Sequence, residues 1–140
     1  MQTWMLYAIL SMIFAGVTAV LAKYGLQNIS ADLGMVICTA LIFLIIVILN
    51  FFGNKYKEFS NLTNLQLMLL LASGITTALS WIFYFRAIKE GPISYVAAID
   101  KASILVTLLL SFLLLKEPVT LKVISSAMLI FAGLLVLIWK

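Results

Sequence analysis

Long apolar stretches without charged side chains fill most of this chain, and short polar segments separate them. Residues 1–22, 33–54 and 59–85 contain no charged side chain, and neither do residues 123–139. A helix needs about 20 apolar residues to cross the hydrocarbon layer, with a lower limit of about 17, because backbone amides find no water there. The pattern predicts membrane-spanning helices at about 4–23, 33–52, 66–86, 94–115 and 119–139.

The predicted helix 94–115 differs from the others because it carries Asp100 and Lys101 in its interior. An ionisable side chain at the centre of a membrane helix costs about 2.5–3.5 kcal/mol on translocon scales, so such residues usually face a cavity or each other. Two interpretations stay open. The two charges neutralise each other, with Lys101 extending toward the nearer membrane surface, or they form a site that contacts a substrate or a coupling ion.

Polar side chains recur at helical spacing along one face of the predicted helix 94–115 and along one face of the predicted helix 66–86. Two such faces can line one aqueous cavity, whereas a single Ser or Thr more often forms a hydrogen bond between membrane helices. The candidate substrate or coupling residues are Asp100, Lys101, Ser103, Thr107, Thr77, Ser80, Trp81 and Tyr84. The candidate residues for close helix packing or dimer contact are Ser11, Ala15, Thr18, Ser126 and Gly133. The predicted helix 33–52 is almost wholly apolar, and we expect it to face lipid.

The connections between the predicted helices contain residues that end or begin helices. Gly91 and Pro92 are expected to end the third helix, because glycine permits a positive φ and proline cannot continue a helix. Ser94 can cap the start of the fourth helix. Pro118 is expected in the first turn of the fifth helix, where proline is tolerated. Because the connections are short, consecutive helices should be antiparallel neighbours.

Composition makes a membrane location the only plausible one for this chain. Hydrophobic residues make up 65% of its 140 residues, and charged residues only 10%. A chain of this length has too high a surface-to-volume ratio to hide so much apolar surface in a soluble fold. We therefore expect an all-α integral membrane protein, a single domain over residues 1–140, in contact with the lipid bilayer.

The residue inventory argues against several classes of function. The chain has no histidine and one cysteine, so we expect no metal site and no cofactor. General acid–base or nucleophilic catalysis would have too few groups to use, so we expect no catalytic residues and no enzyme. The net charge of +4 suits the flanks of membrane helices and does not indicate nucleic acid.

Basic residues are divided evenly between the two sides of the membrane that five spans would create. Orientation normally follows an excess of Lys and Arg on the cytoplasmic side. One predicted side carries Lys55, Lys57, Lys116 and Lys122, and the other carries Lys23, Arg86, Lys89 and Lys140. Either the insertion machinery or one dominant loop sets the orientation, or the chain inserts both ways and pairs as an antiparallel homodimer. Two copies with inverted topology reproduce the repeat architecture of many secondary transporters.

Four segments resemble the EamA domain of the drug/metabolite transporter superfamily. They are residues 84–92 (YFRAIKEGP), 97–101 (AAIDK), 113–117 (LLLKE) and 22–26 (AKYGL), of which the stretch from 84 to 117 is the most specific. Members of this family usually carry ten helices as two tandem repeats, and this chain is similar to the short five-helix bacterial and archaeal group. The resemblance implies a multi-pass protein in the cell membrane of a prokaryote that transports small metabolites.

These features together predict a secondary transporter that works by alternating access, as an antiparallel homodimer. The ammonium of Lys101 favours a zwitterionic or anionic metabolite as substrate. A non-transporting membrane subunit, or a half-transporter that pairs with a different chain, stays open as an alternative. A small multidrug-type cation exporter is a second alternative, but such proteins use an acidic residue in the first helix, and this chain has none there.

Overall fold

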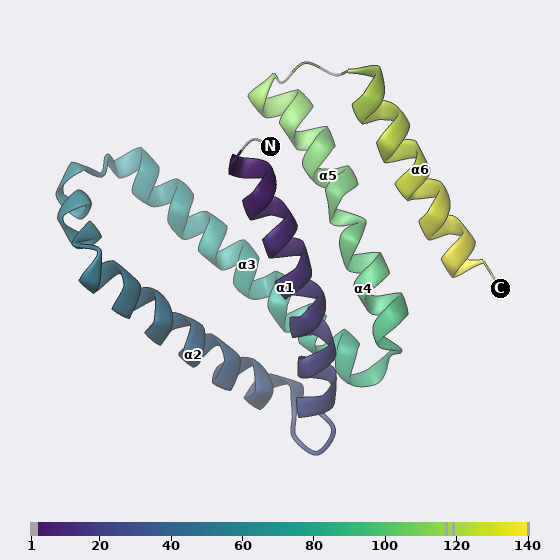
Figure 1. Ribbon diagram of the computed structural model, residues 1–140, viewed down its shortest axis with the longest axis horizontal. Coiled ribbons are helices and arrows are strands. Elements are labelled where there is room, and N and C mark those ends of the chain that lie inside the picture. The colour runs from purple at the N-terminus through teal and green to yellow at the C-terminus, as the bar shows by residue number, and fades with distance from the viewer. Residues whose placement is uncertain (1–2, 117, 119, 140) are drawn as a thin grey trace. The chain divides into compact units, whose positions relative to one another are not determined.

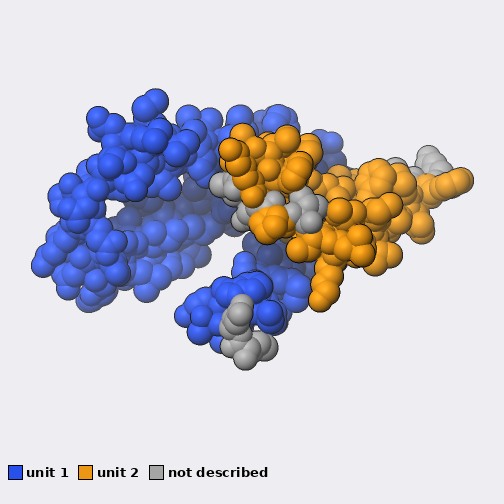
Figure 2. Space-filling model, turned by 90° about the horizontal axis from the view of Figure 1, so that it is seen from above, with its two compact units in different colours: residues 1–90 blue, residues 91–140 orange. Residues whose placement is uncertain are grey.

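The computed structural model describes residues 3–116, 118 and 120–139, and those residues form helices and the connections between them (Figure 1). The elements are α1 (Thr3–Gly25), α2 (Ala31–Phe52), the short 3₁₀ helix η1 (Lys55–Asn61), α3 (Asn64–Glu90), α4 (Ile93–Lys101), α5 (Ser103–Leu110), the π-helical segment η2 (Ser111–Leu115) and α6 (Leu121–Ile138). They divide into two compact units, residues 1–90 and 91–140 (Figure 2).

Four helical stretches are long and apolar enough to cross a membrane. They are Thr3–Gly25, Ala31–Phe52, Asn64–Glu90 and Ile93–Leu114, and Leu121–Leu137 is a shorter apolar helix. These lie where the sequence pattern places its five spans, with ends that differ by a few residues. The segment between the second and third predicted helices contains η1, which the sequence pattern does not indicate.

Polar side chains cap the starts of two helices in unit 1. The Ser30 hydroxyl accepts a hydrogen bond from the Leu33 N–H at 3.2 Å, at the start of α2. Before α3, the Thr63 N–H donates to the Gln66 side-chain oxygen at 2.9 Å, and the Gln66 N–H donates to the Thr63 hydroxyl at 3.3 Å. This reciprocal pair is a capping box, which satisfies two backbone donors that the first helical turn leaves without partners.

Unit 1 is built around α3, which packs against both α1 and α2. One side of α2 contacts α3, and most of its large apolar side chains are exposed, as expected for a helix that faces lipid. The buried residues Ala19, Leu26, Gly34, Phe85 and Ile88 lie near one end of the unit. At that end α1 finishes, α2 begins and α3 finishes (Figure 1). We refer to this end as the convergent end of unit 1.

In unit 2, α4 and α5 both pack against α6. The predicted continuous helix 94–115 is interrupted between α4 and α5, at Ala102. The Ala102 N–H donates to the Ile99 carbonyl at 2.9 Å, and the Leu105 N–H donates to the Ala102 carbonyl at 2.9 Å. These bonds span three residues rather than four, so the backbone tightens locally into a 3₁₀ turn. A second irregularity follows in η2, after which Lys116 has a left-handed conformation with a φ of 53°.

The third helix ends before Gly91 and Pro92 as expected, and Gly91, like the other described glycines, has no positive φ. Two expectations about the connections are wrong. The position before α4 is occupied by Pro92, whose fixed φ and extended ψ start the helix, so Ser94 already lies inside it. Pro118 precedes α6 instead of sitting in its first turn. That helix is capped by Thr120, whose hydroxyl accepts from the Val123 N–H at 3.4 Å.

Candidate functional site

Asp100 and Lys101 end α4 and form an ion pair with each other. Lys101 Nζ donates to Asp100 Oδ2 at 3.2 Å, and the side chains are 69% and 35% exposed, respectively. The structure thus contains the mutual pairing that one interpretation of the sequence expects. The two cavities described below are lined by other residues. The role of the pair in transport stays a prediction.

The ion pair stands immediately before the 3₁₀ turn at Ala102. A continuous α-helix has its interior carbonyls bonded four residues onward, whereas a local 3₁₀ turn changes that pairing and reorients the backbone. The two charges are therefore placed at the one point between α4 and α5 where the helical pattern changes. Sequence reasoning did not find this break, because Ala102 and Ser103 carry no helix-breaking signal.

Several candidate hydroxyl groups bond within their own helices. Thr107 Oγ1 donates to the Ser103 carbonyl at 3.0 Å, and Thr77 Oγ1 donates to the Ser73 carbonyl at 2.8 Å. Ser126 Oγ donates in the same way to the Lys122 carbonyl at 2.8 Å. A hydroxyl that donates to its own helix still has lone pairs that can accept a hydrogen bond. These side chains can therefore contact a ligand or a second helix as acceptors.

The candidates on α3 do not all face the same way. Thr77 and Trp81 line a groove of about 630 Å³ between α2 and α3, together with Thr39 and apolar side chains. Ser80 and Tyr84 are not among the residues that line this groove. The polar face predicted from helical spacing is thus divided, and part of it lies against α2.

The small residues predicted for packing lie in different surroundings. Thr18 lines a cavity between α1 and α2, with its hydroxyl donating to the Phe14 carbonyl at 2.8 Å. Ser11 and Ala15 are exposed on α1. A side chain added at Gly133 on α6 would meet open space, so the surface there leaves room for another helix.

At the convergent end of unit 1, each of two lysines donates hydrogen bonds to backbone carbonyls in the segment that carries, or lies next to, the other lysine. Lys23 Nζ, on α1, donates to the carbonyls of Ile88 at 2.6 Å and Lys89 at 3.2 Å, at the end of α3. Lys89 Nζ donates to the Leu26 carbonyl at 2.7 Å and also to the Ile29 carbonyl, in the segment after α1. We call these four hydrogen bonds the lysine clamp. The last carbonyls of a helix have no hydrogen-bond donor within that helix. Here Lys23 supplies a donor to carbonyls at the end of α3, and Lys89 supplies one to carbonyls in the segment after α1.

An ion pair also joins α3 to α2 at this end. Arg86 Nη2 and Nε donate to Asp32 Oδ1 at 3.2 and 3.3 Å. The sequence places Lys23, Arg86 and Lys89 near helix ends, where basic side chains usually bind the carbonyls of their own helix. Partners more than 50 residues away could not be read from that signal.

The described helices define an all-α, multi-pass membrane protein. Among the residues that the structure describes, no group of three or more His, Cys, Asp or Glu side chains could hold a metal ion.

The chain belongs to the EamA-like transporter family, whose sequence pattern matches residues 2–139. An uncharacterized transporter in the cobO 3′ region of a Sinorhizobium species is 35% identical over 136 residues, which cover 97% of this chain and 96% of that relative. No solved structure matches the chain. The family confirms the resemblance drawn from residues 84–117, and with it an all-α membrane fold and a transport function in general terms. Because the family is one of transporters, it is consistent with the expectation that the protein is not an enzyme.

Proposed function

We propose that this protein is a secondary transporter that carries a small metabolite across a prokaryotic cell membrane by alternating access. The observation that carries the proposal is the local 3₁₀ turn in the helical stretch Ile93–Leu114 directly after Lys101. Secondary transporters commonly form their substrate and ion sites at discontinuous membrane helices, where backbone groups become available beside charged side chains. Family membership and a bacterial relative described as a transporter support the same function.

The proposed substrate or coupling groups in unit 2 are Asp100 and Lys101, with Ser103 and Thr107 on α5. Lys101 supplies an ammonium for a carboxylate, and Asp100 supplies an acceptor for an amine or a coupling proton. This combination favours a zwitterionic or anionic metabolite over a purely cationic drug. The candidates on α3 (Thr77, Ser80, Trp81 and Tyr84) stay predictions from the sequence.

The proposed working form is an antiparallel homodimer. Few side chains of the chain are buried, and the large apolar side chains along α1, α2 and α3 are mostly exposed. One repeat therefore leaves polar and apolar faces that lipid or another protein must cover. An inverted second copy would complete the two-repeat arrangement of secondary transporters, and the even division of basic residues supports insertion in both orientations.

Proteoliposomes that contain only the purified chain test this function. We expect uptake of labelled zwitterionic or anionic metabolites, dependent on an ion gradient and above the level of protein-free vesicles. A cationic drug serves as the comparison solute. Purified protein that moves none of these solutes, and that co-purifies with one stoichiometric partner, would instead support a non-transporting subunit or a half-transporter paired with another chain.

A further inference from the structure

We propose that unit 1 binds an anionic phospholipid at its convergent end, with an acyl chain between α1 and α2 and the phosphate beside the basic side chains. This site is separate from the transport site proposed in unit 2. It rests on a cavity, on the depth of that cavity and on the charges at its edge.

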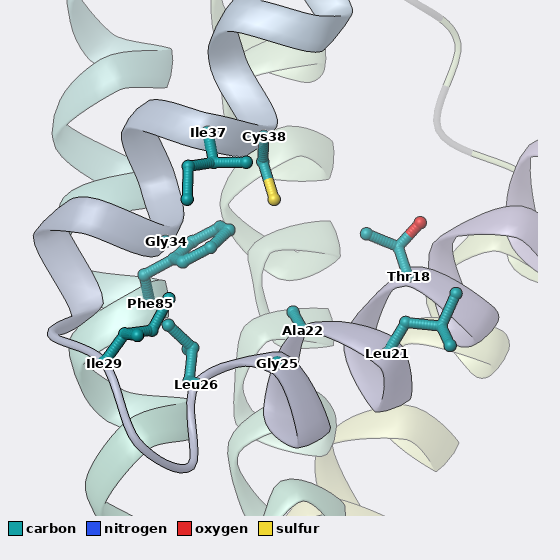
Figure 3. A pocket seen from close by; sticks show the side chains of 10 residues that line it. All are labelled: Thr18, Leu21, Ala22, Gly25, Leu26, Ile29, Gly34, Ile37, Cys38 and Phe85. Carbon is teal, nitrogen blue, oxygen red and sulfur yellow. The ribbon is translucent and has the colours of Figure 1, made fainter.

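The cavity has a volume of about 420 Å³, and its lining includes Phe85 of α3 (Figure 3). Its other lining residues are Thr18, Leu21, Ala22, Gly25, Leu26, Ile29, Gly34, Ile37 and Cys38. The one hydroxyl in this lining, on Thr18, already donates to the Phe14 carbonyl. A lining this poor in polar groups does not suit water or a polar solute, and apolar cavities of only about 150 Å³ take up benzene or xenon. The interior therefore favours a hydrocarbon chain.

The depth of the cavity matches the outer part of one leaflet. It extends along α1 from Gly25, the last residue of the helix, to Thr18. The seven steps between these two residues correspond to roughly 10 Å along the helix axis at about 1.5 Å per residue. A leaflet contributes about half of the roughly 30 Å hydrocarbon layer. An acyl chain that enters beside Gly25 would therefore have its headgroup close to the helix ends.

The charges at these helix ends favour an anionic headgroup. Lys23, Arg86 and Lys89 lie at the convergent end with two carboxylates, Asp32 and Glu90, so one positive charge is not balanced. Lys89 and Arg86 both take part in the contacts that join the chain segments here, which holds their cationic groups in place. A phosphodiester with one negative charge balances the site. Phosphatidylethanolamine carries its own ammonium and does not.

Lipid retention measured by native mass spectrometry tests the proposal. The purified protein is released from nanodiscs that contain equal amounts of phosphatidylglycerol and phosphatidylethanolamine with identical acyl chains. At about 1 kcal/mol per basic group near a membrane surface, one unbalanced charge predicts about fivefold preferential retention of phosphatidylglycerol. Glu90→Gln leaves a second charge unbalanced and should raise that preference about fivefold again.

Two glycines on α1 provide a matched pair of variants. A Cβ added at either Gly16 or Gly25 would meet nothing within 4 Å, but only Gly25 lines the cavity. Gly25→Leu should remove the retained lipid, whereas Gly16→Leu should keep it. If Gly25→Leu does not fold, Ala22→Leu fills the same cavity from a position one turn before the end of α1. Equal retention by the cavity-filling variant and Gly16→Leu would overturn the proposal, and so would equal retention of the two lipids by the unmodified protein.

Cys38 gives a second readout, because it is the one cysteine of the chain and it lines the cavity. Phosphatidylglycerol should slow the reaction of a maleimide with Cys38 several-fold more than phosphatidylethanolamine does. The same rate in both lipids would contradict a site in this cavity that selects the anionic headgroup. Neither measurement uses transport, so failure of the lipid site and failure of the transport function can be told apart.

Discussion

The charged side chains at the convergent end of unit 1 and those at the end of α4 are used in different ways. At the convergent end, Lys23 binds carbonyls 65 and 66 residues away in sequence, and Arg86 binds an aspartate 54 residues away. In α4, Lys101 binds the residue directly before it. The hydrogen bonds and the ion pair at the convergent end connect α1, α2 and α3 to one another. The ion pair in α4 connects only two residues that are already adjacent in the chain.

This difference concerns what each set of charges contributes to the fold. A charged group inside a membrane is costly, and one near a helix end less so because it can reach the interface, so the contacts of both sets are expected to bring a compensating gain. For Lys23, Lys89 and Arg86 that gain is the connection of α1, α2 and α3. For Asp100 and Lys101 the described contact is the pair that they form with each other, and their role in transport stays a prediction.

The largest effect is expected when each of the two aspartates is replaced, because one replacement should abolish uptake and the other should lower the amount of folded protein. Asp100→Asn removes the carboxylate proposed to bind substrate or a coupling proton, so coupled uptake in proteoliposomes should fall to the background level. Asp32→Asn makes the same chemical change in the Arg86 pair and should reduce the amount of folded protein, while each folded molecule still transports. Normal gradient-driven uptake by Asp100→Asn, at normal expression, would remove Asp100 from the mechanism.

Replacing lysines tests stability rather than uptake. Lys23→Met or Lys89→Met removes charge-assisted hydrogen bonds to carbonyls at helix ends, and each change should lower the free energy of unfolding by about 1.5–3 kcal/mol. Lys101→Met removes an exposed pair between adjacent residues and should cost at most about 1 kcal/mol. Thermal unfolding in one detergent compares the three variants. A larger loss for Lys101→Met than for the other two would reverse the roles assigned here.

A glycine at the convergent end tests whether close packing there matters as well as charge. A Cβ at Gly34 would collide with the buried side chain of Leu26, whereas a Cβ at Gly74 on α3 would meet nothing within 4 Å. Gly34→Ala should destabilise unit 1 by about 1–3 kcal/mol, as overpacking does. Gly74→Ala should leave stability unchanged or raise it by up to about 1 kcal/mol, because alanine favours helix. Equal midpoints of chemical unfolding for the two variants would show that Leu26 moves without cost.

The smallest effect is expected at the other end of unit 1, where α3 begins. Thr63→Ala removes one half of the capping box with Gln66 and should cost about 1 kcal/mol. Hydrogen exchange should increase in the first turn of α3 and stay unchanged near Lys23 and Lys89. Faster exchange at both ends would mean that the two ends of the unit do not unfold independently.

Much of the fold follows from the sequence because hydrophobic length determines membrane helices directly. The spans at 4–23 and 33–52 lie within α1 and α2 as the structure places them. The break at Ala102 was missed since neither glycine nor proline marks it. Thr63 and Gln66 have the spacing of a capping box, so that signal was available in the sequence. The lysine clamp was not predictable, because helical periodicity says nothing about which distant carbonyls a flexible side chain reaches.

The candidate site was predicted less completely than the fold. The charges at 100 and 101 stand out in any apolar helix, and their pairing was one of the two expected arrangements. Helical spacing also grouped Thr77 with Ser80 and Tyr84. Of the four α3 candidates, however, only Thr77 and Trp81 line the groove between α2 and α3. Spacing gives the face of a helix and not the neighbour that covers it.

The pairing of two oppositely inserted copies is tested most directly by fixing the orientation of each. Glu58→Lys adds positive charge to the exposed segment between α2 and α3, and Gln27→Lys with Asn28→Lys adds it to the exposed segment between α1 and α2. Each set should force a single, opposite orientation, as reporters at the carboxyl terminus would record. We predict that cells with either variant alone show no uptake and that cells with both regain it. Full uptake from one variant held in a single orientation would contradict the antiparallel dimer.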